Sequence, residues 1–298
     1  MSNFPLRPID TFGILGAGTL GYRIGLQAAL SGFQVLMCDV SQSQLAEAAK
    51  FQGQILQRLA KREVITSAAA EHALARIRTT TDPLRLAAEV DFVSESVTED
   101  LALKQRVWES LAGKWREAAV LTTNTSYLLP SQMAAQSGDE ARFCAFHFHD
   151  VFEARVVDVM PHPGTDAGVV EFLLELGRKL NQVPVHVATE TSGYLFNHML
   201  MAYLGAAGQL LAEGKSTAED IDRSWMGNMG TRVGPFGMLD QIGLDTVDKI
   251  LSVRSDRRSM AFRSVIAPLL EQGYTGAKAG RGFYHYPKPA YATASFLR

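Results

Sequence analysis

The segment Phe146-His147-Phe148-His149-Asp150 lies near the middle of the chain and holds two histidines and a carboxylate. These residue types serve acid–base centres and metal sites, and they also occur as ordinary strand residues. Histidine suits proton transfer because its unperturbed pKa, about 6.5, lets it accept and return a proton near neutral pH. On a strand, His147 and His149 would point to one face and Asp150 to the other, so a metal site would need a further ligand such as His162. No Cys or Glu stands at metal-ligand spacing, so the sequence favours an acid–base centre over a bound metal.

A glycine-rich loop near the start of the sequence is a second chemical feature. Gly16, Gly18 and Gly21 form a G-x-G-x-x-G motif, with Thr19 and Leu20 inside it, between a predicted strand and a predicted helix. In that context the first glycine permits a tight turn, the second lets a pyrophosphate approach the backbone, and the third lets the helix pack on the strand. The helix N-terminus then offers N–H groups to the phosphates. The alternative is a turn that binds no ligand.

Asp39 closes the next predicted strand, 18 positions after Gly21. A carboxylate at about this distance accepts hydrogen bonds from the 2′-hydroxyl of an adenosine ribose and repels a 2′-phosphate. No arginine follows in the segment 39–44. The sequence therefore predicts NAD as the cofactor in preference to NADP.

The first part of the chain must supply the strands that position these residues. Short, mostly continuous apolar runs predict strands at 11–17, 34–40, 91–97, 119–125, 142–149 and 156–160. Continuous runs are typical of strands covered on both faces, and helical segments separate them, including a long amphipathic helix at 43–64. This alternation predicts an α/β domain with a Rossmann-like, parallel, doubly wound sheet over residues 1–189. His147 then lies at a strand end, where ligands bind in open sheets.

The pattern changes from about residue 190. Residues 195–214 form a long, mostly apolar helix that Gly214 is placed to end, and the segment 216–225 opens with a Ser/Thr cap followed by acidic residues. No later strand is predicted, so residues 190–298 are expected to form an all-helical domain. Helices this apolar must be buried, either in their own domain or against a second subunit.

Composition excludes several classes of partner. The formal net charge of −2 argues against a nucleic-acid binder, and no segment approaches the ~18 consecutive apolar residues of a membrane span. The first ten residues lack the apolar region of a signal peptide. Cys38 and Cys144 lie far apart in apolar runs, which suits a reducing compartment. We therefore expect a soluble cytoplasmic protein with a small-molecule substrate and no nucleic-acid or membrane partner.

Taken with the loop, Asp39 and the central histidines, the chain resembles the 3-hydroxyacyl-CoA dehydrogenase family nearly from end to end. The matching segments, in family order, are residues 76–82, 91–108, 122–128, 142–150, 190–200, 233–246 and 276–286. The resemblance implies a Rossmann-like half that binds NAD and a helical half that usually forms a dimer interface. It also implies a CoA thioester as substrate and a homodimer formed through the helical domain.

The same resemblance assigns roles to individual residues. His147 falls on the catalytic histidine, and Asp158 stands where the family has the glutamate that orients it. The remaining matches are Ser126, which would contact cofactor and substrate, Asn197 on the substrate side, and Glu99 with Lys104 as a cofactor-contacting pair. Simpler roles remain open: Glu99 as a solvated carboxylate at a helix start, Lys104 as a surface lysine, Asn197 as an interhelical hydrogen-bond donor, and Ser126 as a helix cap.

The chain also departs from the family pattern around the catalytic histidine. The family usually continues Phe-Phe-Asn-Pro, whereas here His149 and Asp150 replace the second Phe and the Asn, which would add a negative charge on the cofactor side. Arg155 and Arg232 bring cations to segments that are more neutral in the family. These changes favour an acyl pocket reshaped for a short or polar substrate carrying a carboxylate. The basic residues of the long helix either meet the phosphates of CoA or form its solvated face: Lys50, Arg58, Lys61 and Arg62.

Three functions are consistent with the sequence. The first is NAD-dependent, reversible oxidation of the 3-hydroxyl of an L-3-hydroxyacyl-CoA, with His147 as general base and acid oriented by Asp158. The second is a dehydrogenase of a free 3-hydroxy acid, such as a sugar acid or a carnitine-like compound. The third is a catalytically silent NAD-binding structural or sensor protein, against which the intact His147 and Asp158 argue.

Overall fold

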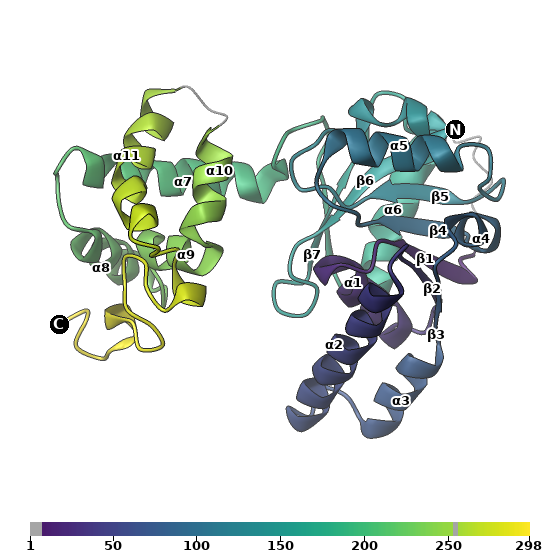
Figure 1. Cartoon of the computed structure of the whole chain (residues 1–298), viewed down its shortest axis with the longest axis horizontal. Coiled ribbons are helices and arrows are strands. Elements are labelled where there is room, and N and C mark those ends of the chain that lie inside the picture. Colours follow the sequence, from purple (N-terminus) through teal and green to yellow (C-terminus); the bar gives the residue numbers. More distant parts are fainter. Residues whose placement is uncertain (1–7, 253–255) are drawn as a thin grey trace. The chain divides into compact units, whose positions relative to one another are not determined.

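A computed structural model describes residues 8–252 and 256–298 of the chain (Figure 1). These residues fall into two compact units, the first ending at Leu195 and the second beginning at Phe196. The first unit carries the sheet, and the second is built from helices.

The first unit contains one sheet of eight strands, in the order β3-β2-β1-β4-β5-β6-β7-β8. The strands are β1 Thr11–Leu15, β2 Gln34–Cys38, β3 Ile77–Thr80, β4 Phe92–Glu95, β5 Val120–Thr123, β6 Phe143–Phe148, β7 Val156–Met160 and β8 Val183–His186. Six of the seven neighbouring pairs run parallel, and β6 with β7 is antiparallel. The Rossmann-like class is therefore confirmed. The prediction of an all-parallel sheet is wrong at β7, and β3 and β8 were not predicted.

Helices cover both faces of this sheet, as strands buried on both sides require. The face built on Phe12, Ile14 and Val35 packs against α1 Thr19–Leu30, α2 Gln42–Lys61, α3 Ser67–Ala75 and α6 Ala167–Lys179. The other face, with Leu15 and Leu36, packs against α4 Pro83–Glu89 and α5 Leu101–Leu111. Alternate residues of β1 and β2 thus enter opposite cores, following the two-residue period of a strand.

The strand order reverses between β1 and β4, since β2 and β3 lie on one side of β1 and β5 and β6 on the other. The loops at the carboxyl ends of β1 and β4 therefore part at this point and leave a crevice, which is where open α/β sheets bind ligands. The glycine loop, Asp39 and the segment after β4 all follow strands of this central group.

The second unit consists of α7 Tyr194–Ala212, whose first two residues belong to the first unit, followed by α8 Ala218–Met229, α9 Pro235–Ile242, α10 Leu244–Ser252 and α11 Arg257–Glu271. Gly214 has a φ of +64° just after α7, and the Thr217 side chain caps α8, as predicted. Among its described residues we find only isolated β-bridges and no strand of a sheet. The all-helical prediction is confirmed.

The C-terminal segment completes the core of the second unit. Tyr284, Tyr291 and Phe296 pack with helix residues such as Phe236. Two buried carboxylates bind this segment. Asp240 accepts hydrogen bonds from the N–H groups of Phe283 and Tyr284, both at 2.9 Å, and Asp222 accepts the Tyr284 hydroxyl at 2.8 Å. The last turns of the chain are therefore held by polar contacts inside the core.

Among the described helices, none combines the length and apolarity needed to cross a membrane. Cys38 and Cys144 are both buried free thiols. Burial raises the pKa of the Cys38 thiol to about 12, so it stays protonated at neutral pH. Both cysteines therefore act as small apolar residues of the sheet.

Candidate active site

The glycine loop joins β1 to α1 in the conformation that the motif predicts. Gly16 has a φ of +102°, and a Cβ there would lie 2.8 Å from the backbone of Ser96. A Cβ on Gly21 would collide with the carbonyl oxygen of Gly16. Gly18, in contrast, has open space on the side where its Cβ would be, with no heavy atom within 4 Å among the described residues. The first and third glycines are thus required by the turn and the packing, and the second leaves room for a group to approach.

A cleft of about 510 Å³ opens beside this loop and is lined by Gly16, Gly18, Asp39 and the segment 96–98 that follows β4. No side chain among the described residues caps the start of α1, at Thr19 and Leu20, so its first N–H groups are left for a ligand. The cleft and its donors fit the pyrophosphate and adenosine of a dinucleotide.

Asp39 shapes the loop as well as lining the cleft. Its Oδ2 accepts the N–H of Ala17 at 2.9 Å, and its Oδ1 accepts the N–H of Ser41 at 2.9 Å. The side chain is half-buried at the carboxyl end of β2. Its remaining lone pairs are available to ribose hydroxyls, and its charge opposes a phosphate at the same place.

His147 sits at the end of β6, buried, directly opposite Asp158 of β7 in the antiparallel register. Its Nδ1 lies 3.2 Å from Asp158 Oδ2, and its Nε2 lies 3.3 Å from the Ser126 hydroxyl. The ring stacks on Tyr194, with centroids 4.5 Å apart and planes 13° apart. An ionised Asp158 favours the tautomer with the proton on Nδ1, so the Nε2 lone pair faces Ser126.

The electrostatics of this pair keep the imidazole neutral and the carboxylate ionised. Burial lowers the pKa of His147 below its ordinary value, although the hydrogen bond to Asp158 opposes this. Burial alone would raise the pKa of Asp158, but hydrogen bonds from His147 and His149 outweigh it and hold that pKa below its ordinary value. A neutral histidine beside a carboxylate is the state in which the ring accepts a proton.

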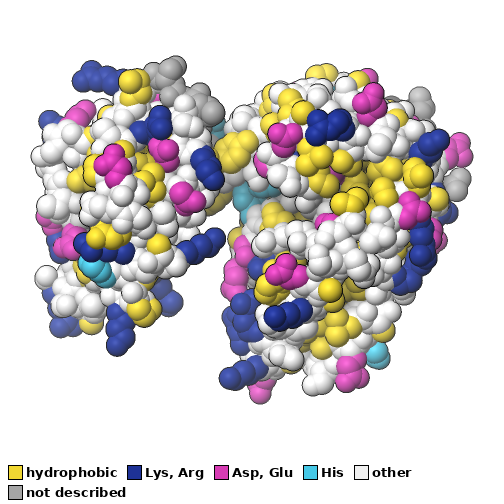
Figure 2. Space-filling model, in the orientation of Figure 1, with side chains coloured by type: hydrophobic (Ala, Val, Ile, Leu, Met, Phe, Trp, Pro, Cys, Tyr) yellow, Lys and Arg dark blue, Asp and Glu magenta, His cyan; other side chains and the backbone are white. Residues whose placement is uncertain are grey.

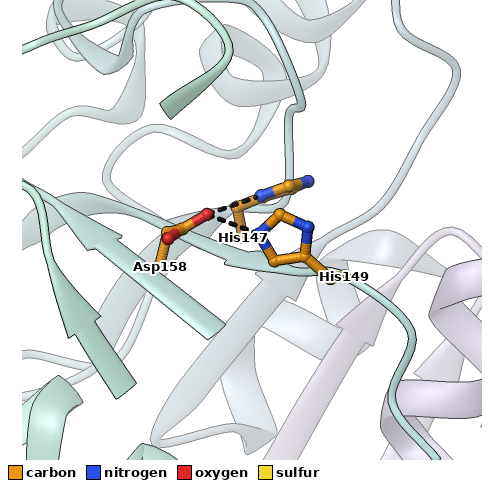
Figure 3. A group of neighbouring side chains, drawn as sticks. All are labelled: His147, His149 and Asp158. Atoms are coloured by element: carbon orange, nitrogen blue, oxygen red, sulfur yellow. Dashed lines mark hydrogen bonds and ion pairs between the residues drawn. The ribbon is translucent and has the colours of Figure 1, made fainter. Parts of the chain in front are cut away.

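His149 also binds Asp158, a contact that the sequence did not predict. Its Nε2 lies 2.7 Å from the same Oδ2 that receives His147, so both rings point at one carboxylate (Figure 3). One donor atom of each of these three residues lies within 4.8 Å of the others. His162, the further ligand considered from the sequence, is engaged elsewhere: its Nε2 contacts the carbonyl of Glu140 at 3.0 Å.

The turn after β5 is held by Glu99. One carboxylate oxygen of Glu99 accepts the hydroxyl of Thr125 and the N–H groups of Ser126 and Tyr127, the last two at 2.8 and 3.2 Å. The Tyr194 hydroxyl donates to the carbonyl of Thr125 at 2.8 Å, and burial raises the pKa of Tyr194 so that it remains a donor. Glu99 and Tyr194 together therefore hold the loop that places the Ser126 hydroxyl beside His147.

Lys104 is buried inside the first unit. Its Nζ lies 2.7 Å from Glu95 Oε1, a residue of β4 with no exposed surface, and 3.5 Å from Glu99 Oε2. Glu95 also accepts the hydroxyl of Thr123 and the N–H of Val97. The simpler interpretation as a surface lysine is wrong. The predicted cofactor contact of Glu99 and Lys104 stays a prediction.

The other charged residues that depart from the family pattern make different contacts. Asp150 forms an ion pair with Arg23 of α1 at 2.7 Å and accepts two N–H groups of its own loop, so the negative charge it adds is neutralised within the protein. Arg155 is exposed in that loop, and Arg232 is exposed in the second unit. Asn197 is half-buried on α7 in the second unit. The cofactor-side role of Asp150 and the substrate-side role of Asn197 stay predictions.

Sequence reasoning missed several residues that build this site. Tyr194 stacks on His147 and holds the Ser126 loop. Asn124 accepts the N–H of Phe148 at 2.8 Å and so ties β5 to the strand that carries His147. Both lie in segments that match the family pattern, but nothing in their types alone distinguishes them from core residues.

Comparison with known proteins is consistent with this geometry. The profile of the 3-hydroxyacyl-CoA dehydrogenase NAD-binding domain matches residues 11–191, and that of the C-terminal domain matches residues 193–286. Among solved structures, a diketoreductase acting on dicarbonyl compounds is 31% identical with a TM-score of 0.88. The (S)-3-hydroxybutyryl-CoA dehydrogenase of Ralstonia eutropha is 30% identical with a TM-score of 0.84, and FadB2 of M. tuberculosis is 26% identical with the same TM-score. Each alignment covers 94% of this chain and 100% of the other.

Proposed function

Because this chain belongs to the 3-hydroxyacyl-CoA dehydrogenase family and carries its NAD-binding domain, we propose that it reversibly oxidises the 3-hydroxyl of a 3-hydroxyacyl-CoA to the 3-ketoacyl-CoA. Membership of the family establishes that the chain is an NAD-dependent oxidoreductase. The identity of the substrate is what we propose. One observation carries it: the continuous chain of contacts from Asp158 through His147 to the Ser126 hydroxyl.

The chain's own residues handle the proton in this reaction. His147 Nε2 accepts the proton of the substrate hydroxyl, while Asp158 stabilises the imidazolium that forms. The Ser126 hydroxyl, 3.3 Å from that nitrogen, shares a hydrogen bond with the reacting oxygen and fixes its direction. Bound NAD would supply the hydride acceptor for the carbon that bears this hydroxyl. In reduction the protonated His147 donates to the carbonyl oxygen.

Exposed cations on α2 support a CoA thioester. Lys50, Arg58 and Lys61 lie on the exposed side of this helix, and Arg62, which follows its last residue, pairs with Glu153 at 3.4 Å. Arg58 also lines a shallow cleft of about 290 Å³ between α1 and α2, together with Tyr22 and Phe51. Cations beside a partly apolar cleft suit phosphates attached to an adenine ring.

A second candidate is a dehydrogenase or reductase of a free 3-hydroxy acid or a dicarbonyl compound. It is favoured by the diketoreductase, which is 31% identical, and by the two exposed arginines that replace neutral family positions. Such an enzyme would use the same His147 and Asp158 and would not need the cations of α2. The silent, structural or sensor alternative has no support in the site, because every group needed for proton transfer is in contact.

The test is NADH oxidation by the purified protein with acetoacetyl-CoA, run beside free acetoacetate. Turnover with the CoA ester alone is expected, and His147→Gln should lower kcat by about 10²–10⁴-fold while NADH affinity is kept. Turnover with the free acid alone would select the second candidate. A His147→Gln enzyme with the wild-type rate would show that another group moves the proton.

A further inference from the structure

The side chains of His147, His149 and Asp158 form a compact group, called here the His-Asp-His group (Figure 3). We propose that this group binds a divalent first-row transition-metal ion, with Zn²⁺ as the type, and that the bound ion stops proton transfer by His147. Metal binding is independent of the proposed function, whereas the inhibition rests on the proposed function.

The backbone places all three donors on one side of the sheet. His147 and His149 are two positions apart on β6 and its continuation, where side chains of alternate residues share a face. The pairing continues to His149, because its N–H bonds the carbonyl of Val156. Asp158 lies directly across from His147 on β7. Two imidazoles from one strand and a carboxylate from its neighbour thus converge from rigid elements, which is the preorganisation that a metal site needs.

The two distances from the histidine nitrogens to Asp158 Oδ2 are close to those of a metal site, and all three donor atoms lie within 4.8 Å of one another. An ion held tetrahedrally with bonds of about 2.0–2.1 Å needs donor atoms roughly 3.3 Å apart. His147 Nδ1 and Asp158 Oδ2 are already 3.2 Å apart. His149 Nε2, now 2.7 Å from that oxygen, must move outward by roughly 0.6 Å. The His149 side chain is 12% exposed, compared with 4% for His147 and 2% for Asp158, so it is the least enclosed of the three.

The donor set also selects the kind of ion. Neutral imidazole nitrogens suit Zn²⁺, Co²⁺, Ni²⁺ and Cu²⁺, whereas Mg²⁺ and Ca²⁺ prefer sites made wholly of oxygen. Three protein ligands leave one tetrahedral position for water. Tyr194 stacks on the His147 ring and so restrains the orientation of this histidine as a ligand.

Metal binding changes which nitrogen of His147 carries the proton. In the hydrogen-bonded state Nδ1–H donates to Asp158, and the Nε2 lone pair faces Ser126. An ion bound at Nδ1 uses that lone pair, so a neutral ring must then carry its proton on Nε2. Nε2 becomes a donor and can no longer accept a proton from a hydroxyl. The ion would therefore act as a switch without entering the reaction.

The binding experiment titrates chelator-treated wild-type protein with Co²⁺, and then with Zn²⁺, while the visible d–d absorption is recorded. One Co²⁺ per chain with tetrahedral bands, displaced by Zn²⁺, is expected. His149→Phe, which restores the family residue, should weaken Co²⁺ binding by at least about 10²-fold. His149→Gln serves as a second variant, because it keeps a hydrogen-bond donor for Asp158 and removes the imidazole ligand. His72→Phe, at an exposed histidine of α3, is the matched control and should bind as the wild type does.

The inhibition experiment measures acetoacetyl-CoA reduction in Zn²⁺, with each variant compared with its own metal-free rate. Zn²⁺ should inhibit wild type and His72→Phe reversibly, with recovery on adding chelator, and should leave His149→Phe and His149→Gln at their metal-free rates. Absent cobalt bands, or equal cobalt affinity in the His149 variants, would overturn the site. Cobalt binding without inhibition would overturn the switch. Cobalt binding in a protein that turns over neither acetoacetyl-CoA nor acetoacetate would refute the proposed function and leave the metal site standing.

Discussion

At the scale of single residues, one carboxylate organises the chemistry. Asp158 Oδ2 forms hydrogen bonds with both His147 and His149. Its negative charge is therefore shared between the ring that moves the proton, His147, and the neighbouring ring of His149. The family pattern predicted the first contact. The second was not predicted, because it needs the His149 side chain to turn toward the carboxylate that already faces His147, and no sequence pattern specifies that.

The pH dependence of the reaction follows from the environment of His147. Burial lowers its pKa, Asp158 and Glu99 raise it, His149 lowers it, and the net direction is downward. Oxidation needs the neutral ring, so its kcat/KM is lost as pH falls through this pKa. We expect that loss below the ordinary value of about 6.5. Reduction needs the protonated ring and should decline as pH rises through the same range.

The measurement is kcat/KM against pH in both directions, with a chelator present throughout. Asp158→Asn removes a charge that raises the pKa of His147 and should move the oxidation limb to still lower pH while lowering the rate. An inflection above the ordinary histidine value would contradict the buried, neutral state.

Cofactor preference is a second property set by single residues. Asp39 lines the cleft, and Val40 beside it is 83% exposed. In Asp39→Ala/Val40→Arg the repulsion of a 2′-phosphate is removed and a cation is supplied. The ratio of kcat/KM for NAD to that for NADP should fall by on the order of 10²-fold.

The single change Val40→Arg is the control for this experiment. It keeps Asp39, so it should keep the preference for NAD. If it shifts the preference as far as the double variant does, the Asp39 carboxylate has no part in the selection.

At the scale of elements, the sequence was sufficient for the strands that position the site. Apolar runs predicted β1, β2, β4, β5, β6 and β7, each within a few residues of its observed bounds. The two strands that escaped are edge strands: β3 has a single apolar residue, Ile77, and β8 contains Pro184. Edge strands carry weak patterns because only part of each is buried. The short connection 149–155 allows only an antiparallel pair, since a parallel crossover needs about a dozen residues.

Lys104 shows where periodicity fails as a guide to burial. A surface lysine was the alternative to a cofactor contact at this helix position, yet the ammonium of Lys104 is buried against Glu95. The ion pair between Lys104 and Glu95 joins α5 to β4, next to the loop that carries Glu99. Nothing in one sequence shows that two charges meet inside a core.

Breaking this pair should be costly. Lys104→Met leaves the Glu95 carboxylate buried without its cation, and we expect the free energy of unfolding to fall by about 3–5 kcal/mol. Glu95→Gln/Lys104→Met keeps polar partners for Thr123 and Val97 without an unpaired charge, and should recover at least about half of that loss. Urea unfolding measures both.

NADH affinity separates the structural role of Lys104 from a cofactor contact. If Lys104 only supports the loop, the double variant should bind NADH nearly as well as the wild type does. Weak NADH binding in both variants, with stability restored in the double variant, would place Lys104 in contact with the cofactor.

At the scale of the whole molecule, acidic and basic side chains are interspersed on the face shown in Figure 2, with no continuous field of one sign. The second unit instead presents an apolar groove of about 560 Å³ between α7 and α8, with Tyr203, Leu210, Trp225 and Met229 among its walls. The Tyr203 hydroxyl and the Trp225 Nε1 have no hydrogen-bond partner among the described residues. In the homodimer that the family resemblance implies, a second copy of the chain would cover this groove.

Leu210→Glu tests the dimer. Leu210 is 45% exposed within one chain, so glutamate there should cost the monomer little, whereas it would bury a charge in a dimer interface. Sedimentation should show a dimeric wild type and a monomeric variant. Met260→Glu, at a residue of α11 that is 61% exposed, is the matched control and should remain a dimer. A dimeric Leu210→Glu protein would exclude the groove as the interface.

The contacts of Asp222 and Asp240 have a consequence for synthesis. The first unit can complete its sheet while the second is still being translated, because β8 ends at His186. The core of the second unit instead needs Tyr284, Tyr291 and Phe296. Asp240 takes its hydrogen-bond donors from this late segment, whereas Asp222 already accepts the N–H groups of Phe236 and Gly237 in α9. On the ribosome, α8 and α9 must therefore expose an unfinished core, and Asp240 must lack its donors, until these residues leave the exit tunnel. We expect a nascent chain of this protein to be most prone to aggregation in this interval.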